Sequence, residues 1–304
     1  MYCYRHLPRI LLLRFLQIAA LIWAGFTAPV NAAQIERGCA ALVRKVPGLT
    51  LEKCLAAALQ PSDARSVQGR TLWLRDLPPH SGTAQLKVLV LGAMHGDEAA
   101  SSTVVFDWIE RAKQATTDRI YWRMLPAVNP DGLFKRPATR VNARGVDLNR
   151  NFPTSDWNSQ AHRYWVKRTQ RDPRRFPGPA PLSEPETRWV YGQIDMFKPD
   201  LIVSVHAPYG VLDFDGPPPP PSRLGGLYLD QVGIYPGSLG NYGGVQKRVP
   251  VVTVELKHAL KAPSDEEMAL MWQDLAAWID SRLLRLASAA SKGDVQDMQE
   301  HAGH

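Results

Sequence analysis

The chain has 304 residues, of which 45% are hydrophobic and 21% are charged, and a formal net charge of +7. These values are ordinary for a globular protein, and they exclude a disordered or collagen-like chain. The basic residues are dispersed, apart from a cluster at 171–175, and they form no basic stripe interleaved with aromatic residues. We therefore expect no nucleic-acid partner.

The first 32 residues form a segment of their own. Residues 1–9 are basic without an acid, residues 15–26 are apolar, and small residues follow at Val30 and Ala32. This pattern predicts a secretory signal peptide over 1–32, and hence a periplasmic or secreted protein without a stable membrane span. An uncleaved N-terminal anchor is the alternative, although the apolar run is shorter than the roughly 20 residues that a spanning helix needs.

Cysteine usage agrees with export. Cys3 belongs to the signal segment, and Cys39 and Cys54 remain in a predicted helical lead-in over 33–65. In an oxidising compartment these two residues could form a disulfide, and two free thiols are the alternative. The chain contains no Cys-x-x-Cys pattern, which excludes a cysteine-based zinc site of that kind.

Strands and helices alternate beyond the lead-in. A hairpin or edge strand is expected over 66–77, around a turn at Gly69. Apolar runs typical of buried strands cover residues 85–93, 119–130, 199–206 and 249–256. Helical periodicity covers residues 97–114, 183–197 and 264–287, and the last two ranges open with the Ser-x-x-Glu pattern of a capping box.

This alternation predicts an α/β domain over 66–286, with a doubly wound, mixed, mostly parallel sheet and helices on both faces. A polar tail follows over 287–304. The proline run at 217–221 is expected to be a stiff loop at the rim of a pocket, with a docking ligand as the alternative.

Four polar side chains follow three of the predicted strands. His95 and Glu98 come after the first strand, and His206 and Glu255 end two later ones. Ligands of open α/β sheets bind at the carboxyl ends of strands. Two histidines and a glutamate are typical of a catalytic zinc site with an open position. We therefore predict one zinc ion bound by His95, Glu98 and His206, with Glu255 as the general base.

The segment 140–153 makes this interpretation specific. It places Arg140 ahead of a GVDLNRN run that contains Asn149 and Arg150. Together with the HxxE pair, the distant histidine and the late glutamate, in this order, the chain resembles the M14 zinc carboxypeptidase family over about residues 66–285. The resemblance implies a zinc-dependent peptidase that cuts at the C-terminus of its substrate.

The resemblance also implies a role for each residue. Arg150 and Asn149 would hold the terminal carboxylate of the substrate, since a guanidinium fork suits a planar anion. Arg140 would stabilise the oxyanion. Tyr235 resembles the mobile family tyrosine that closes on substrate, and a packed loop tyrosine is the alternative.

Other acidic residues receive lesser roles. We expect Asp97 to cap a helix or to orient His95, and Asp147 to fix the loop that binds the carboxylate. Asp213 and Asp215 could meet an ammonium group on the substrate. A turn at Asp215-Gly216 is the alternative for this segment.

The blocks at 129–153, 183–187 and 236–244 resemble the murein peptide amidase branch of the family. That branch cuts the bond between γ-D-glutamate and meso-diaminopimelate in cell-wall peptides. Recycling members work in the cytoplasm, whereas the export signal points to the periplasm. The alternatives are a general periplasmic carboxypeptidase for ordinary peptides, and a peptidoglycan-binding protein with a degenerate site.

Overall fold

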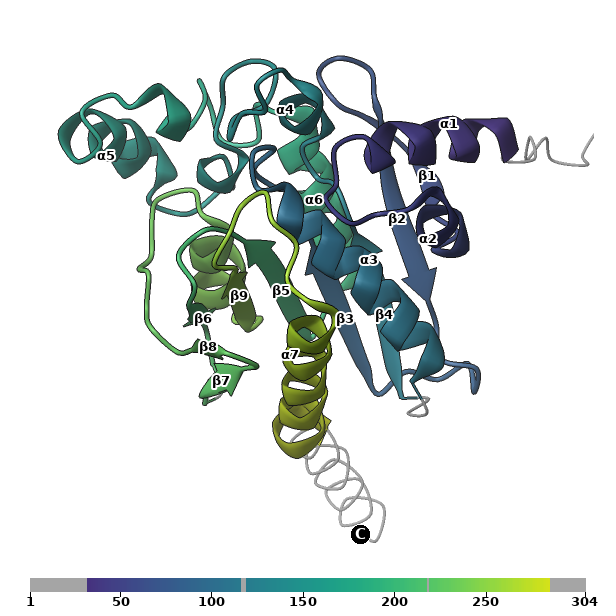
Figure 1. The fold of residues 1–304 in the computed structure, drawn as a ribbon. Helices are drawn as coiled ribbons and strands as arrows, with labels where there is room; N and C mark the ends of the chain where they lie inside the picture. Colours follow the sequence, from purple (N-terminus) through teal and green to yellow (C-terminus); the bar gives the residue numbers. More distant parts are fainter. Residues whose placement is uncertain (1–31, 116–118, 218, 285–304) are drawn as a thin grey trace, which may run out of the picture.

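The computed structural model describes residues 32–115, 119–217 and 219–284. The predicted signal peptide, apart from its last residue, and the predicted polar tail lie outside the described residues. A seven-stranded sheet has the order β1-β2-β4-β3-β5-β9-β6 (Figure 1). Its strands are β1 (Gln60–Arg65), β2 (Thr71–Leu77), β3 (Leu86–Leu91), β4 (Ile120–Leu125), β5 (Leu201–His206), β6 (Leu212–Asp215) and β9 (Val251–Glu255), and the short strands β7 (Arg223–Leu224) and β8 (Leu227–Tyr228) form a separate hairpin.

Helices cover both faces of the sheet (Figure 1). The helices are α1 (Ala32–Val43), α2 (Leu51–Ala56), α3 (Ala99–Gln114), α4 (Pro130–Phe134), α5 (His162–Lys167), α6 (Pro185–Phe197) and α7 (Asp265–Trp278), with the short helical segments η1 (Leu148–Arg150), η2 (Trp157–Ala161), η3 (Pro173–Arg175), η4 (Gly240–Gln246) and η5 (Ile279–Leu284). The first three helices and α7 pack on one face, and α6 packs on the other. No helix within the described ranges is long and apolar enough to cross a bilayer.

The central strands β4, β3, β5 and β9 run parallel to one another. At the two ends of the sheet, β1, β2 and β6 pair antiparallel with their neighbours. Alternate side chains of β3 enter two different cores, with Val88 and Val90 in one and Leu89 and Leu91 in the other. Burial on both faces explains the continuous apolar runs of the sequence. The predicted mixed, mostly parallel α/β sheet is confirmed.

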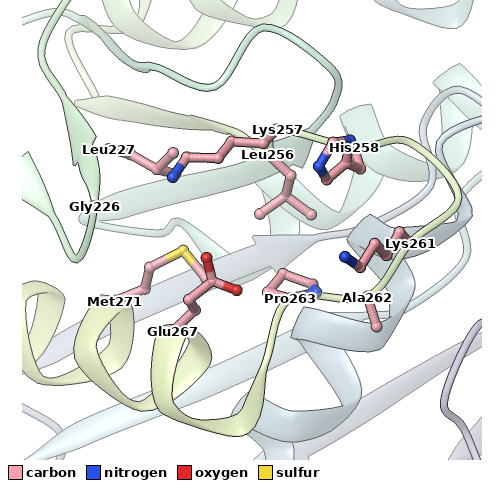
Figure 2. A pocket seen from close by; sticks show the side chains of 10 residues that line it. All are labelled: Gly226, Leu227, Leu256, Lys257, His258, Lys261, Ala262, Pro263, Glu267 and Met271. Carbon is pink, nitrogen blue, oxygen red and sulfur yellow. The ribbon is translucent and has the colours of Figure 1, made fainter.

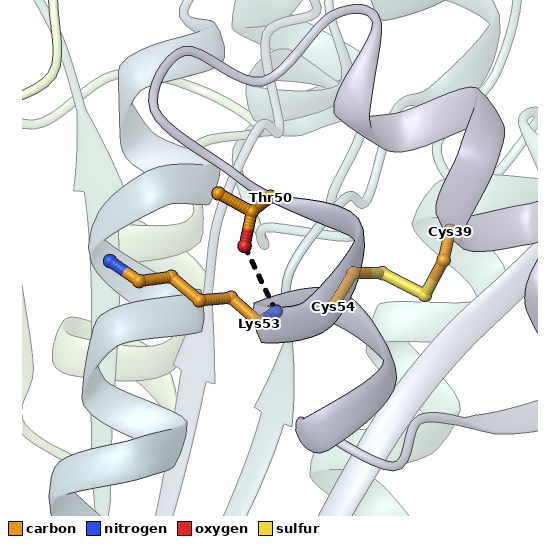
Figure 3. The surroundings of a disulfide bond; sticks show 4 residues. All are labelled: Cys39, Thr50, Lys53 and Cys54. Atoms are coloured by element: carbon orange, nitrogen blue, oxygen red, sulfur yellow. Dashed lines mark hydrogen bonds between the residues drawn. A yellow bond between two sulfur atoms is a disulfide. The ribbon is translucent and has the colours of Figure 1, made fainter.

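The N-terminal helices are joined by the predicted disulfide between Cys39 of α1 and Cys54 of α2, and both cysteines are buried (Figure 3). The helical lead-in does not extend to residue 65, because residues 60–65 form strand β1, which pairs with β2 across the turn at 66–70. The sequence does not predict this strand because it contains Pro61 and Asp63, and both residue types are depleted in strands. The strand can form because β1 lies at the edge of the sheet, where proline is tolerated.

The helix starts follow the sequence patterns only in part. The capping box of Ser264 and Glu267 forms at the start of α7, as predicted. The one predicted at Ser183 is wrong, because α6 begins one residue later and the Ser183 hydroxyl donates to the Glu184 carboxylate instead. The segment after β4 forms the one-turn helix α4, which Asn129 caps by accepting the Gly132 N–H at 2.9 Å.

Candidate metal centre and active site

The sheet face that α6 covers changes from apolar to polar where the parallel strands end. Alternate residues of a strand point to the same face. On β5 the buried Ile202 is followed on this face by Ser204 and then His206. The sheet register pairs Ser204 with Thr253 and His206 with Glu255 on β9. The strand alternation thus presents a histidine and a glutamate side by side at the carboxyl edge.

The three predicted metal ligands lie together, with ligand atoms within 4.8 Å of one another. His95 Nδ1 lies 2.8 Å from Glu98 Oε1 and 3.1 Å from His206 Nδ1. Glu98 Oε2 lies 3.0 Å from His206 Nδ1. All three side chains are buried. Two imidazole nitrogens and a carboxylate that converge in this way form a donor set that fits zinc.

The second nitrogen of each imidazole also has a partner. His95 Nε2 lies 3.1 Å from Asp147 Oδ1, and His206 Nε2 lies 2.9 Å from Ser204 Oγ. Metal-binding histidines usually donate their other N–H to such a group, which fixes the tautomer and the orientation of the ring. Nδ1 of each ring is therefore the nitrogen that faces the metal position.

The charges around the centre favour ionised carboxylates. Burial by itself would raise the pKa of Glu98, but the neighbouring histidines hold that pKa below its usual range. Burial likewise opposes ionisation of Asp147, but Arg140 and His95 hold its pKa well below the usual value. Burial and Arg140 would lower the pKa of His95, and the two carboxylates raise it instead. Metal ligands bind in their deprotonated forms, so a divalent cation would displace the proton that the raised pKa favours on His95.

Arg140 and Glu255 flank the metal position. Arg140 Nε donates to Asp147 Oδ2 at 2.9 Å, and its Nη1 lies 3.4 Å from Glu98 Oε1. Glu255 is 7% exposed, and its Oε2 has no hydrogen-bond partner among the described residues. Burial raises the pKa of Glu255. A buried carboxylate of raised pKa beside a metal position can exchange a proton during catalysis.

Arg150, Asn149 and Tyr235 line the same pocket as the two histidines. The Arg150 guanidinium lies 4.4 Å from the centre of the Tyr235 ring, and its buried Nε has no partner in the described part of the chain. The Asn149 Oδ1 accepts the Leu239 N–H at 2.8 Å, which leaves its amide group as a donor. The pocket therefore presents a guanidinium and an amide suited to a carboxylate.

Every predicted site residue belongs to one constellation. Seven of them line this pocket, and the eighth, Glu98, contacts both histidines. The Tyr235 hydroxyl donates to the Val232 carbonyl at 2.7 Å, and burial raises its pKa. The rings of Tyr235 and Tyr164 also pack edge to face, with their centroids 5.6 Å apart. Tyr235 is thus positioned at the pocket wall beside Arg150.

Asp97 has neither of its expected roles. Helix α3 begins after Glu98 without a side-chain cap, and Asp97 pairs with Arg174 at 2.8 Å. The carboxylate that contacts the outer nitrogen of His95, Nε2, is Asp147, which was expected only to fix its loop. Asp147 does that as well, since its Oδ1 accepts the Asn149 N–H. Nothing in the sequence distinguishes these two aspartates as partners of the histidine.

Three further charged residues also line the pocket. Arg175, in the basic cluster that the sequence singled out without a role, lines it from η3. Asp213 and Asp215 line it from β6, so both are strand residues that face the pocket, and the chain bends directly after them at Gly216. The segment 157–176, which includes α5, lies beyond the sheet edge to which the β5 arrow points (Figure 1). It brings Arg175 to the pocket.

Two other features lie outside this site. A second pocket between α7 and the segment after β9 is lined by Leu256, Lys257 and Met271, among others, and it contains none of the predicted site residues (Figure 2). The proline run does not line the active-site pocket in the described residues. The Pro219 carbonyl accepts from Trp278 Nε1 at 3.3 Å, so this part of the run packs against α7.

The zinc carboxypeptidase family model matches residues 61–212, a range that includes the three metal ligands. The chain is 35% identical to murein peptide amidase A of Escherichia coli (strain K12) over 127 residues, which cover 41% of this chain and 50% of that protein. It is 30% identical to murein peptide amidase A of Vibrio campbellii (strain ATCC BAA-1116) over 175 residues, which cover 55% and 68%. The chain thus spans about half the length of the E. coli relative.

Solved structures agree on the fold. The crystal structure of carboxypeptidase A from Helicoverpa armigera matches with a TM-score of 0.57 at 17% identity, over 84% of this chain and 72% of that one. The matched family model covers half of the chain, from the sheet hairpin through the last metal ligand. The chain belongs to the zinc carboxypeptidase family.

Proposed function

We propose that the protein is a zinc-dependent carboxypeptidase that hydrolyses the last amide bond of a peptide. The observation that carries this proposal is the shared pocket, in which the metal ligands His95 and His206, the carboxylate Glu255 and the guanidinium of Arg150 meet. A guanidinium beside a hydrolytic metal centre selects substrates with a free terminal carboxylate, which is the property of an exopeptidase.

The side chains divide the chemistry among themselves. Zinc in this site supplies Lewis acidity toward the scissile carbonyl and a water of lowered pKa. Glu255 accepts the proton of the attacking water and delivers it to the leaving amine. Arg140 is placed to stabilise the negative charge that develops on the carbonyl oxygen. Arg150 and Asn149 hold the terminal carboxylate and orient the bond to be cut.

The natural substrate in this proposal is a murein peptide, cut between γ-D-glutamate and meso-diaminopimelate. The names of the E. coli and V. campbellii relatives support it. The released residue has the carboxylate that Arg150 requires. The disulfide between Cys39 and Cys54 supports the periplasm as the place of action, since such bonds persist in oxidising compartments. The predicted signal peptide supports the same location.

The test is product analysis by mass spectrometry with the purified protein. Its substrates are L-Ala-γ-D-Glu-meso-diaminopimelate, the same tripeptide with its terminal carboxylate amidated, and a mixture of ordinary peptides. We expect release of diaminopimelate from the free acid only, and its abolition by a zinc chelator. If ordinary C-terminal residues are released and diaminopimelate is not, ordinary peptides would replace the murein peptide as the proposed substrate. No cleavage of any substrate by zinc-loaded protein would overturn the enzymatic proposal in favour of a binding protein.

A further inference from the structure

Two buried carboxylates lie in the active-site pocket beyond the catalytic groups. Asp213 and Asp215 are 6% and 8% exposed, and they share one face of β6 because they are two residues apart. Both line the pocket that contains His206 and Arg150. Across the described ranges, neither of the two forms an ion pair with a basic side chain.

The protein itself satisfies these carboxylates only in part. Asp213 Oδ1 accepts the N–H of the adjacent Phe214 at 2.9 Å, and the Val232 backbone N–H also donates to this carboxylate. Asp215 makes no side-chain hydrogen bond to the residues that the structure describes. Gly240 leaves the space that the Asp215 carboxylate occupies, because a Cβ at this position would collide with Asp215 Oδ2. Burying ionised carboxylates without a cation is unfavourable, so these two side chains either take up a proton or pair with a positive group from outside.

The strand order places the two carboxylates relative to the reacting bond. Strand β9 lies between β5 and β6, and Asp213 pairs with Thr253, two residues before Glu255. Strands lie about 4.8 Å apart, so β6 is on the order of 10 Å from the strand that ends in His206. The pocket therefore combines a receptor for a carboxylate, a hydrolytic centre, and an anionic wall within the reach of one amino-acid side chain.

We infer that the residue released by this enzyme carries an ammonium group on its side chain, which Asp215 and Asp213 bind. The inference rests on the proposed function and names the chemistry of the residue that is cut off. A side-chain ammonium would pair with both carboxylates while the α-carboxylate of the same residue meets Arg150. Diaminopimelate and lysine share this group, whereas a neutral side chain would leave both carboxylates unpaired.

Three substrates with the same γ-D-glutamyl group test the inference with the zinc-loaded protein. They end in meso-diaminopimelate, in lysine, and in norleucine, which has a side chain similar to that of lysine without the ammonium. We expect kcat/KM for the lysine substrate to exceed that for norleucine by about 10- to 150-fold, the range for a hydrogen bond to a charged group. Equal or faster cleavage of the norleucine substrate would overturn the inference and leave the proposed function intact.

The diaminopimelate substrate separates the two sources of the ammonium. Faster cleavage than that of the lysine substrate supports the inference with a murein source, and slower cleavage supports it with ordinary peptides. If none of the three is cut, the proposed function fails. Calorimetry of lysine and norleucine binding to the zinc-loaded protein then still decides the inference, because lysine must bind more tightly.

Variants locate the effect. We expect Asp215→Asn, and independently Asp213→Asn, to reduce the lysine-to-norleucine ratio of kcat/KM at least about tenfold, since a hydrogen bond to a charged group is worth about 1.5–3 kcal/mol. Asp63→Asn is the matched control, because Asp63 is exposed on β1 at the opposite edge of the sheet. Thermal melts confirm folding of each variant. An unchanged ratio in both folded pocket variants would overturn the assignment.

Discussion

Asp147 Oδ1 lies 3.1 Å from His95 Nε2 and also accepts the Asn149 N–H at 3.0 Å. Its other oxygen accepts from Arg140 Nε at 2.9 Å. One buried carboxylate therefore contacts a proposed metal ligand, the arginine proposed to stabilise the oxyanion, and the loop proposed to bind the terminal carboxylate. In the proposed function, metal binding and substrate alignment are coupled through this side chain.

Replacement of this carboxylate should weaken zinc binding. Asp147→Asn removes the negative charge that orients the His95 imidazole and stabilises its N–H donor. We expect the zinc Kd to rise by about 10- to 100-fold, as is usual when the outer partner of a metal-binding histidine is lost. Competition with a chromophoric chelator measures it, with Asp63→Asn as the control. A Kd equal to that of the wild type would show that Asp147 only supports its loop.

Replacement of Glu255, the proposed general base, should lower turnover without loss of zinc. Glu255→Gln should retain a full equivalent of zinc, because Glu255 is outside the ligand set, and lose about 100- to 10,000-fold in kcat, because glutamine cannot accept the proton. Metal analysis and turnover on the murein tripeptide are measured on the same sample. Near-wild-type turnover would exclude Glu255 as the base, and loss of zinc would place it among the ligands.

Much of the fold and the site could be predicted because the decisive patterns are local. The parallel strands are largely buried on both faces, and each therefore appears in the sequence as a mostly apolar run, interrupted by Lys87 in β3 and by Arg123 in β4. The metal ligands follow from this assignment, since the carboxyl ends of neighbouring strands meet at one edge. His95, Glu98 and His206 come together from two such ends.

The remainder depends on contacts that no local pattern encodes. Strand β6 is short, and Asp213, Asp215 and Gly216 look like a turn, yet pairing with β9 makes it the outer strand. Arg175 reaches the pocket from the segment 157–176. The neighbouring Arg174 holds this segment in place by an ion pair with Asp97. Such tertiary contacts override turn and charge patterns, and they cannot be read from spacing.

The terminal-carboxylate receptor can be tested directly. Arg150→Gln removes the guanidinium, and we expect kcat/KM for free-acid peptides to fall by about 10- to 150-fold, the range for a hydrogen bond to a charged group. Arg150→Lys should recover only part of this loss, because an ammonium cannot form two parallel hydrogen bonds. Kinetics on the free-acid tripeptide measure both. Full activity of the lysine variant would contradict bidentate hydrogen bonding between Arg150 and the terminal carboxylate.

Arg175 should discriminate between two cationic substrates. Its side chain is 35% exposed at the pocket, and diaminopimelate has a second carboxylate that lysine lacks. We expect Arg175→Gln to lower the diaminopimelate-to-lysine ratio of kcat/KM by about two- to fivefold, the size of a partly exposed ion pair. Arg163→Gln on the exposed part of α5 serves as the matched control. The same ratio in both variants would mean that Arg175 does not contact the substrate.

The preference for a cationic residue should depend on pH. Burial, together with the charge of Asp213, raises the pKa of Asp215 to about 7. Burial also raises the pKa of Asp213. Asp215 is therefore mostly protonated at pH 6 and mostly ionised at pH 8, whereas the lysine ammonium is charged at both. The lysine-to-norleucine ratio of kcat/KM should rise by about tenfold between these values, in proportion to the ionised fraction.

This ratio isolates the acidic wall from the catalytic groups. Titration of groups common to both reactions changes the two kcat/KM values alike and cancels in their ratio. Only the titration of a group that interacts with the substrate ammonium can change the ratio. The rise with pH should therefore disappear in Asp215→Asn. A flat ratio in the wild type would mean that Asp215 is ionised throughout this range or does not face the ammonium. Calorimetric lysine binding at the same two pH values separates these cases, because an ionised, contacting Asp215 still requires lysine to bind far more tightly than norleucine.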